Sequence, residues 1–425
     1  MASFDKNPPD EVSASAVTTK VPSHTWSVLR TRNYALSFWG QLISSTGTQL
    51  QIVAVVWQVY LLTHSAVALG LIGLTQAIPR LAFSLVGGLF ADTLDRRKLL
   101  LVIEGVLAAL SAVLAICTLL HIINIFIIYT VVLIAASVSA FEFPARQAII
   151  PGLVARGQMT VAISMNMMML QVTSIIGPIV GGFMLASLGI ANTYWLDVIS
   201  YAVVIGSLLL MTVPRISIEE RPQTGIDAIV DGLRFLRTQP IILAVITLDF
   251  FATFFGSPIA LLPVFANDIM HVGAHGLGVL LAADSIGAVI LTPFTGRIGR
   301  IPRQGLGIAV AIIIWGICIA AFGLLPGSLW LAALLLAGAG AANMVSMILR
   351  FLVIQLITPD KFRGRISAIN AMFAFGGPLL GQFESGLVAS LVTPQFSVVS
   401  GGIACILATL AIVTLVPALL RVQVH

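Results

Sequence analysis

Long apolar runs separated by short polar breaks fill most of this 425-residue chain. Each run reaches the length of about 20 residues that an α-helix needs to cross the hydrocarbon core of a bilayer. The runs are too long for membrane β-strands and do not alternate with their two-residue period, so they predict helices. Twelve spans are expected, at residues 34–62, 67–91, 99–120, 125–143, 159–186, 193–213, 241–270, 277–296, 305–325, 329–350, 366–391 and 396–420.

The longest break, Pro214–Pro240, divides the spans into six plus six. The apolar residues between Ile226 and Leu236 share one helical face, which is typical of a helix lying on the inner membrane surface. The first residues lack the apolar run of a secretory signal. We therefore expect a cytoplasmic N-terminal tail at 1–33, an N-terminal six-helix half at 34–213, a cytoplasmic linker with an amphipathic helix at 214–240, a C-terminal six-helix half at 241–420 and a cytoplasmic C-terminus at 421–425.

The positive charges support the same topology. Charged residues make up only 9% of the chain and hydrophobic residues 58%. With the N-terminus in the cytoplasm, the loops on the opposite side contain no Lys or Arg, as the positive-inside rule predicts. Only Arg80 falls deep inside a span, while Arg350 is assigned to the cytoplasmic end of the tenth. The net charge of +5 thus reflects topology, and nucleic acid is excluded as a partner.

Chemistry that would indicate an enzyme is missing from the sequence. Cys117, Cys318 and Cys405 lie in apolar runs without metal-ligand spacing. There is no phosphate-binding Walker loop, no zinc-binding His-Glu-x-x-His motif and no nucleophile elbow. We expect no cofactor and no metal, and infer that an ion or substrate gradient supplies the energy. A non-transporting sensor is the less favoured alternative, because it would leave the charges inside the spans unexplained.

Two stretches repeat between the halves. Gly177–Gly181 in the fifth span and Gly377–Gly381 in the eleventh have the same Gly-Pro-x-x-Gly pattern. Glycines four residues apart allow helices to pack closely, and the proline permits a local bend. Duplicated six-helix halves are the organisation of the major facilitator superfamily. The loop Gly88–Lys98 resembles the signature loop of that superfamily, although Thr93 and Asp95 depart from it.

The resemblance implies roles for these residues. The loop would form a conformational latch in which Arg96 pairs with an acid at the inner end of span four; the latch residues are Gly88, Asp92, Arg96, Arg97 and Glu142. Gly177, Pro178, Gly181 and Gly182 resemble the antiporter motif of drug:proton exchangers, with Thr173 in place of the usual first glycine. Phe143–Ala148, Leu262–Ala266 and Phe383–Val388 are similar to the bacterial branch of macrolide-efflux and enterobactin-exporter-like proteins.

Six ionisable residues lie inside the predicted spans: Arg80, Glu104, Asp197, Asp249, Asp284 and Glu384. A charge near the bilayer centre costs at least about 2.5–3.5 kcal/mol, so each is a functional candidate. Glu104 and Asp197 lie near span ends and are interpreted as structural. Asp249, Asp284 and Glu384 are the candidates for proton coupling, with Arg80 as a tuning charge and an anchor for an anionic substrate group.

A mostly apolar cavity with few polar groups suits amphipathic organic molecules better than sugars. The residues expected to line it are Arg80, Gln76, Ser44, Thr48, Gln51, Phe250, Phe254, Asn343, Asn370 and Phe373.

These patterns predict an all-α polytopic membrane protein with the major facilitator fold. The function expected is proton-coupled antiport that exports drugs or siderophore-like compounds across the bacterial inner membrane. A lysophospholipid transporter or facilitator of the same fold is the alternative. The partners expected are a small-molecule substrate, protons and membrane lipids, and the protein is expected to be a monomer with both termini in the cytoplasm.

Overall fold

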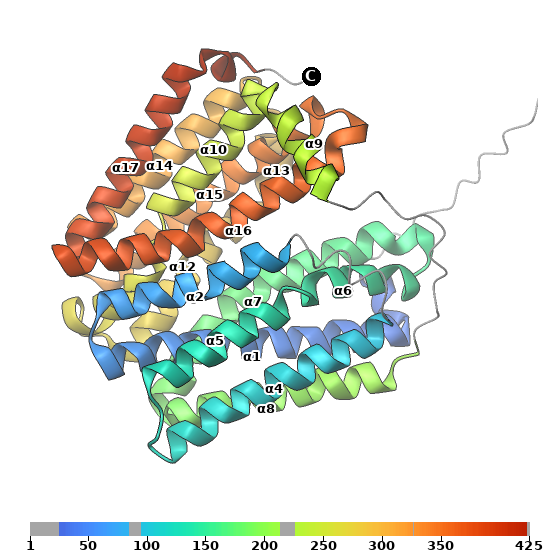
Figure 1. Ribbon diagram of the computed structural model, residues 1–425, viewed down its shortest axis with the longest axis vertical. Coiled ribbons are helices and arrows are strands. Elements are labelled where there is room, and N and C mark those ends of the chain that lie inside the picture. The colour runs from blue at the N-terminus through green and yellow to red at the C-terminus, as the bar shows by residue number, and fades with distance from the viewer. Residues whose placement is uncertain (1–24, 85–94, 213–225, 326, 423–425) are drawn as a thin grey trace, which may run out of the picture.

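The computed structural model describes residues 25–84, 95–212, 226–325 and 327–422. These residues form helices joined by short turns, and the helices gather into two bundles that follow one another along the chain (Figure 1). The latch residues Gly88 and Asp92 lie outside the described residues. We call the end of the molecule that carries the helix α9 (Ile226–Arg237) the linker end, and the opposite end the far end.

The N-terminal half begins with a short 3₁₀ turn, η1 (Thr25–Arg30), followed by the long helix α1. Asn33 near the start of α1 donates to the carbonyl oxygen of Thr212 at 2.8 Å, so the first and last helices of the half meet at the linker end. The helices are α1 (Arg32–Thr63), α2 (Ala66–Ser84), α4 (Arg96–Leu119), α5 (Ile125–Ser139), α6 (Glu142–Ile149), α7 (Met159–Leu188) and α8 (Ile190–Leu210), with short turns η2 (Ile150–Gly152) and η3 (Arg156–Gln158) before α7.

The C-terminal half repeats this plan with more interruptions. Its first span is broken after Phe255, because Gly256 and Pro258 interrupt the helix before a π-helical turn closes it. The elements are α10 (Pro240–Phe255), η4 (Ile259–Leu261), α11 (Leu262–Val264), η5 (Phe265–Ile269), α12 (Gly273–Leu291), η6 (Thr292–Phe294), α13 (Thr295–Ile298), α14 (Gln304–Leu324), α15 (Leu329–Ile357), α16 (Asp360–Leu391), α17 (Pro394–Leu415) and η7 (Pro417–Arg421).

Eleven helical segments of the described chain are long and apolar enough to cross a membrane. The remaining span is α1, the first in the chain. It falls short of that apolar content because polar side chains interrupt it, but it packs within the bundle against α7 and α8. Three predicted boundaries were wrong. The fourth span continues through α6 instead of ending at 143, and the tenth continues to Ile357 instead of ending at Arg350. The eleventh begins at Asp360 instead of 366.

Helix α9 lies against the linker end of α16. Phe235 stacks on Phe362 with ring centroids 4.2 Å apart, and Arg365 Nη1 lies 3.4 Å from Asp231 Oδ2. Gly232 lets the two helices approach, because a Cβ there would lie 3.1 Å from Arg365 Cβ. The linker helix is therefore attached to the C-terminal half.

The halves meet along two glycine seams near the far end. In the first, Gly70 of α2 lies against Gly386 of α16, and a Cβ on Gly70 would lie 2.8 Å from the carbonyl oxygen of Gln382. In the second, Gly182 of α7 lies against Gly278 of α12. Figure 1 shows α2 and α16 side by side. Both seams bring backbone against backbone, which side chains would prevent.

A polar contact completes the closure of the far end. The hydroxyl of Tyr60, at the end of α1, donates to Asp268 and accepts from Asn267 Nδ2 at 2.8 Å. Both partners belong to the π-helical turn η5 of the other half. The closure is also apolar, since one buried cluster joins residues of both halves, including Val53 and Leu277.

The linker end of the N-terminal half has a separate apolar core. It gathers buried side chains of α1, α4, α7 and α8, among them Tyr34, Leu100, Met165 and Tyr201, and it contains no described residue of the C-terminal half. The halves thus share one buried core, and the N-terminal half has a second core of its own at the linker end.

Candidate functional site

A buried ion pair lies in the interior of the C-terminal half. Asp249 on α10 accepts from Arg350 on α15, with Arg350 Nη2 2.7 Å from Asp249 Oδ1. Their side chains are only 8% and 7% exposed. The attraction between the two charges offsets part of the desolvation free energy that burying either charge alone would cost. The predicted coupling candidate Asp249 therefore has a basic partner here, and that partner is Arg350 rather than Arg80.

The placement of Arg350 corrects its assignment to a cytoplasmic end. Because α15 runs seven residues further to Ile357, the arginine lies about 10 Å inside the helix end. The sequence did contain a signal, since the apolar stretch Phe351–Ile357 continues the run up to Thr358 and Pro359. Arg146 falls just beyond the predicted end of the fourth span at 143, where the sequence predicts a cytoplasmic loop, and it instead lies within α6.

The N-terminal half holds a charge cluster around Arg146. Its guanidinium bonds to Glu104 of α4 and, through Nε at 2.6 Å, to Glu142 of its own helix α6. The Glu104 side chain is fully buried, and its second oxygen, Oε2, has no hydrogen-bond partner among the described residues. Arg80 on α2 interacts electrostatically with Glu142, but no salt bridge joins the two among the described residues. The predicted cavity arginine thus lies near this cluster without being paired in it.

Asp197 on α8 is also fully buried. Ser111 Oγ donates to its Oδ2 at 2.8 Å, and Ser200 Oγ lies 3.3 Å from its Oδ1. Among the described residues Asp197 forms no salt bridge. Gly47 of α1 covers the carboxylate, because a Cβ at Gly47 would lie 2.8 Å from Asp197 Oδ1.

The Asp284 side chain is exposed, and its neighbours on the same face of α12 show in which direction it points. Leu280 and Leu277 precede it by four and seven residues, on the same face of α12. Both are essentially fully buried, at 1% and 0% exposure, so this face points into the protein and not to lipid. Asp284 is therefore exposed on the linker side of Gly278, the α12 residue of the second glycine seam.

Three of the predicted aromatic residues meet on the C-terminal half. Phe250 stacks on Phe254 of α10 with centroids 5.7 Å apart, and it meets Phe373 of α16 edge-on at 5.7 Å. All three rings are partly exposed. They form an apolar wall next to the Asp249 position.

The predicted polar residues separate into two groups. Ser44 is buried, and Thr48 lies 3.3 Å from the Tyr201 hydroxyl, so both face α8 inside the N-terminal half. Half-buried positions are occupied by Gln51, Gln76, Asn343, Asn370 and Glu384.

The described latch residues have other partners in this state. Arg96 Nη1 donates to the carbonyl oxygen of Ala148 at 2.5 Å. Arg97 donates to the carbonyl oxygens of Leu208 and Leu209 at 2.7 and 2.8 Å, which ties α4 to the end of α8. Glu142 is paired with Arg146. The pairing of Arg96 with Glu142, expected when the opposite side is open, stays a prediction.

The antiporter-motif glycines divide between two interfaces. A Cβ on Gly181 would lie 3.2 Å from Val53 Cγ2, and Gly177 is packed even more tightly against Gln49, so both face α1. Gly182 faces α12 across the second seam, where a Cβ would lie 2.6 Å from the Ala274 carbonyl oxygen. The motif thus sets the packing both within the half and between halves.

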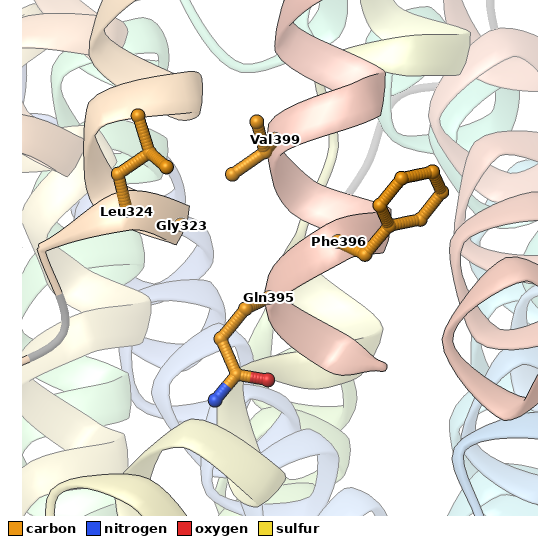
Figure 2. A pocket seen from close by; sticks show the side chains of 5 residues that line it. All are labelled: Gly323, Leu324, Gln395, Phe396 and Val399. Atoms are coloured by element: carbon orange, nitrogen blue, oxygen red, sulfur yellow. The ribbon is translucent and has the colours of Figure 1, made fainter. Parts of the chain in front are cut away.

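A surface groove of about 330 Å³ lies elsewhere, between the ends of α14 and α17 (Figure 2). Gly323, Leu324, Gln395, Phe396 and Val399 line it. It holds no ionisable side chain and lies apart from the carboxylates described above, so it is not the candidate site.

The family model of the MFS_3 family, transmembrane secretion effectors, matches residues 23–422. The chain belongs to this family. It is a transporter of the major facilitator superfamily and not an enzyme, as the duplicated motifs predicted. The enterobactin exporter EntS of Salmonella typhi is 28% identical over 363 residues, covering 85% of this chain and 86% of that protein. The EntS protein of Citrobacter koseri is 27% identical over 386 residues, covering 90% and 92%.

Solved structures of the same fold are similar over most of the chain. A mutant form of the nucleoside transporter NupG has a TM-score of 0.72 at 13% identity, covering 91% of this chain and 99% of that one. A bacterial homologue of the iron transporter ferroportin in an inward-facing state has a TM-score of 0.69 at 15% identity, with the same two coverages. At such identities the likeness concerns the fold alone, and it confirms the predicted twelve-helix architecture.

Proposed function

We propose that this transporter exports an amphipathic, siderophore-like small molecule across the bacterial inner membrane in exchange for protons. The observation that carries the proposal is the buried pair of Asp249 and Arg350 beside the aromatic wall of Phe250 and Phe373, together with the exposed carboxylate of Asp284. The exporters of enterobactin that the chain resembles support the substrate class.

The linker end is taken as cytoplasmic, with both termini on that side. The basic residues of the described loops support this orientation. The far end, closed by Tyr60 and the glycine seams, would then face the periplasm, and the structure would correspond to an inward-open state. A substrate could enter from the cytoplasm in this state.

The cavity chemistry matches an aromatic or amphipathic substrate. The C-terminal half offers the ring faces of Phe250, Phe254 and Phe373. Arg80, which belongs to the N-terminal half, offers a positive charge to an anionic group of the substrate. A carboxylate that exchanges a proton as the cavity alternates would couple export to the gradient. Asp249 and Asp284 are the candidates, followed by Glu384.

The test uses a bacterial strain that lacks its own exporters. Cells that express this protein are expected to secrete a catecholate siderophore, and everted vesicles to accumulate it when a pH gradient is imposed. Vesicles without the gradient serve as the control. Movement of a labelled lysophospholipid in liposomes without a gradient, and no siderophore transport, would favour the lipid-transporter alternative and overturn the proposal.

A further inference from the structure

A polar stripe follows one face of α15. Asn343, Ser346 and Arg350 are spaced by three and four residues, so they lie one above the other. The opposite face carries Trp330 and Leu334, which are 76% and 68% exposed. The stripe therefore points into the C-terminal half, toward α10, where Arg350 meets Asp249.

Each member of the stripe has a buried polar atom without a hydrogen-bond partner among the described residues. The atoms are Asn343 Oδ1, Ser346 Oγ and Arg350 Nη1. Ser346 is fully buried and Arg350 is 6% exposed. Buried polar atoms are normally paired, and those without a protein partner are typically bound by ordered water. Three such atoms on one face indicate one shared site.

The chemistry of the three atoms matches water better than any larger ligand. Arg350 Nη1 can only donate, Asn343 Oδ1 can only accept, and Ser346 Oγ can do either. A water molecule can both donate and accept a hydrogen bond, and it is small enough to lie beside a fully buried side chain. The seven residues from Asn343 to Arg350 span about 10 Å along the helix, a distance that a short file of waters covers.

The stripe leads from the neighbourhood of an exposed carboxylate to the buried pair. Gly340, three residues before Asn343, packs against the backbone of Asp284, whose side chain is exposed. Asn343 itself is half-buried, whereas Ser346 and Arg350 are buried. One end of the stripe thus lies near accessible solvent and the other at Asp249.

We propose that Asn343, Ser346 and Arg350 bind a file of ordered water molecules that carries protons between the cavity and Asp249. The inference rests on the proposed proton coupling. The Asp249 carboxylate gains a proton from the adjacent water, that water takes one from the next, and the cavity replaces the proton at the Asn343 end. Arg350 stays protonated and acts as a positioning residue, since it holds Asp249 with one nitrogen and the file with the other.

The transport test compares Ser346→Ala with Ser346→Thr, which keeps the hydroxyl. Ser346→Ala is expected to lower export driven by a pH gradient several-fold, while downhill exchange at equal pH continues at the native rate. Ser346→Thr should retain most of the driven rate. The matched control is Ser397→Ala, another buried serine of this half, whose hydroxyl donates to the Ser385 carbonyl oxygen at 2.8 Å.

Two further measurements separate the possible failures. A structure of the purified full-length protein, at a resolution that shows water, should place density within hydrogen-bond distance of Arg350 Nη1 and Ser346 Oγ. Ordered side chains without such density would contradict the proposed file of water molecules.

The transport measurements separate the proposed coupling from the proposed file of water molecules. If Asp249→Asn abolishes driven export but Ser346→Ala does not slow it, the coupling is supported and the file of water molecules is rejected. If Asp249→Asn pumps normally, the coupling assignment fails, and water at the stripe carries no coupled proton. An equal loss in both transport modes, with weaker substrate binding, would make the stripe a substrate contact.

Discussion

The charge of the C-terminal interior depends on two residues. Asp249 and Arg350 neutralise each other at 2.7 Å, and each is buried. Protonation of Asp249 would leave the positive charge of Arg350 uncompensated, whereas deprotonation of Asp249 would restore the ion pair. The protonation state of one carboxylate is thereby linked to the electrostatics of the α10–α15 interface, which is the property that an antiporter needs.

Replacing Asp249 by Asn should therefore uncouple transport. We expect Asp249→Asn to abolish export against a gradient while downhill exchange remains measurable in everted vesicles. Asp360→Asn is the matched control, because Asp360 is 88% exposed in its pair with Arg363. Native-rate pumping by both Asp249→Asn and Asp284→Asn would contradict the assignment and make Glu384 the next candidate.

Removing the arginine alone should destabilise the fold. Arg350→Met leaves the Asp249 charge buried without a partner, a change that costs about 3–5 kcal/mol. The double variant Asp249→Asn/Arg350→Met removes both charges and should recover most of that loss. Thermal unfolding in detergent measures the order of the two variants. A double variant no more stable than Arg350→Met would show that the pair is not the main contribution.

The sequence identified these acids but not their bases. Asp249 and Asp284 were singled out because carboxylates are rare in apolar runs, and the structure places Asp249 in a buried pair and leaves Asp284 exposed. Arg350 and Arg146 were missed because an arginine near a predicted span end looks the same whether the helix stops or continues. Only packing against Asp249 and Glu104 distinguishes the two cases.

At the scale of elements, the glycines of α7 and α12 decide how closely the halves approach. Gly182 and Gly278 lie in mutual backbone contact, with Gly278 also against the Pro178 carbonyl oxygen. The pattern Gly-Pro-x-x-Gly-Gly was visible in the sequence. Which glycine faces which helix could not be read from it, because that depends on the rotation of α7 between α1 and α12.

A side chain on the second seam should prevent closure of the far end. Gly182→Ala is expected to lower transport several-fold at normal expression and to shift the population away from the state described here. Spin-label distances between the far ends of α7 and α12 measure that shift. Gly206→Ala on α8 is the control, because a Cβ there meets nothing within 4 Å. An unchanged distance distribution in Gly182→Ala would contradict the role of the seam.

The motif position facing α1 gives a second comparison. Gly181→Leu should separate α1 from α7 and reduce transport more than expression, since Leu50 and Val53 already lie within van der Waals contact of a Cβ. Full activity of this variant, measured in the same vesicles, would show that the motif is incidental here.

At the scale of the whole molecule, the latch residues of the N-terminal half are predicted to exchange partners between states. The contacts of Arg96 with Ala148 and of Glu142 with Arg146 belong to the state that is closed at the far end. The resemblance to the superfamily predicts that Arg96 and Glu142 pair when the linker end closes. Twelve helices in two halves were predictable from hydropathy and charge, but the state of the molecule was not, because one sequence encodes both.

Charge reversal tests the exchange. Arg96→Glu and Glu142→Arg are each expected to impair transport, and the double variant to recover part of it. Labels at the two positions should move closer when the far end opens. A separation that is the same in both states would reject the latch. Because Glu142 also bonds Arg146, Glu104→Gln serves to show the effect of disturbing that cluster alone.

The glycine seams also bear on how easily the molecule can switch. Since backbone meets backbone at the seams, parting them requires no change of rotamer there. The polar bonds that must break with them are those of Tyr60 with Asp268 and Asn267. A hydrogen bond contributes about 0.5–1.5 kcal/mol, or up to about 3 kcal/mol with a charged partner. Binding one substrate molecule or one proton supplies free energy of that order, so a single ligand can offset the loss of these bonds.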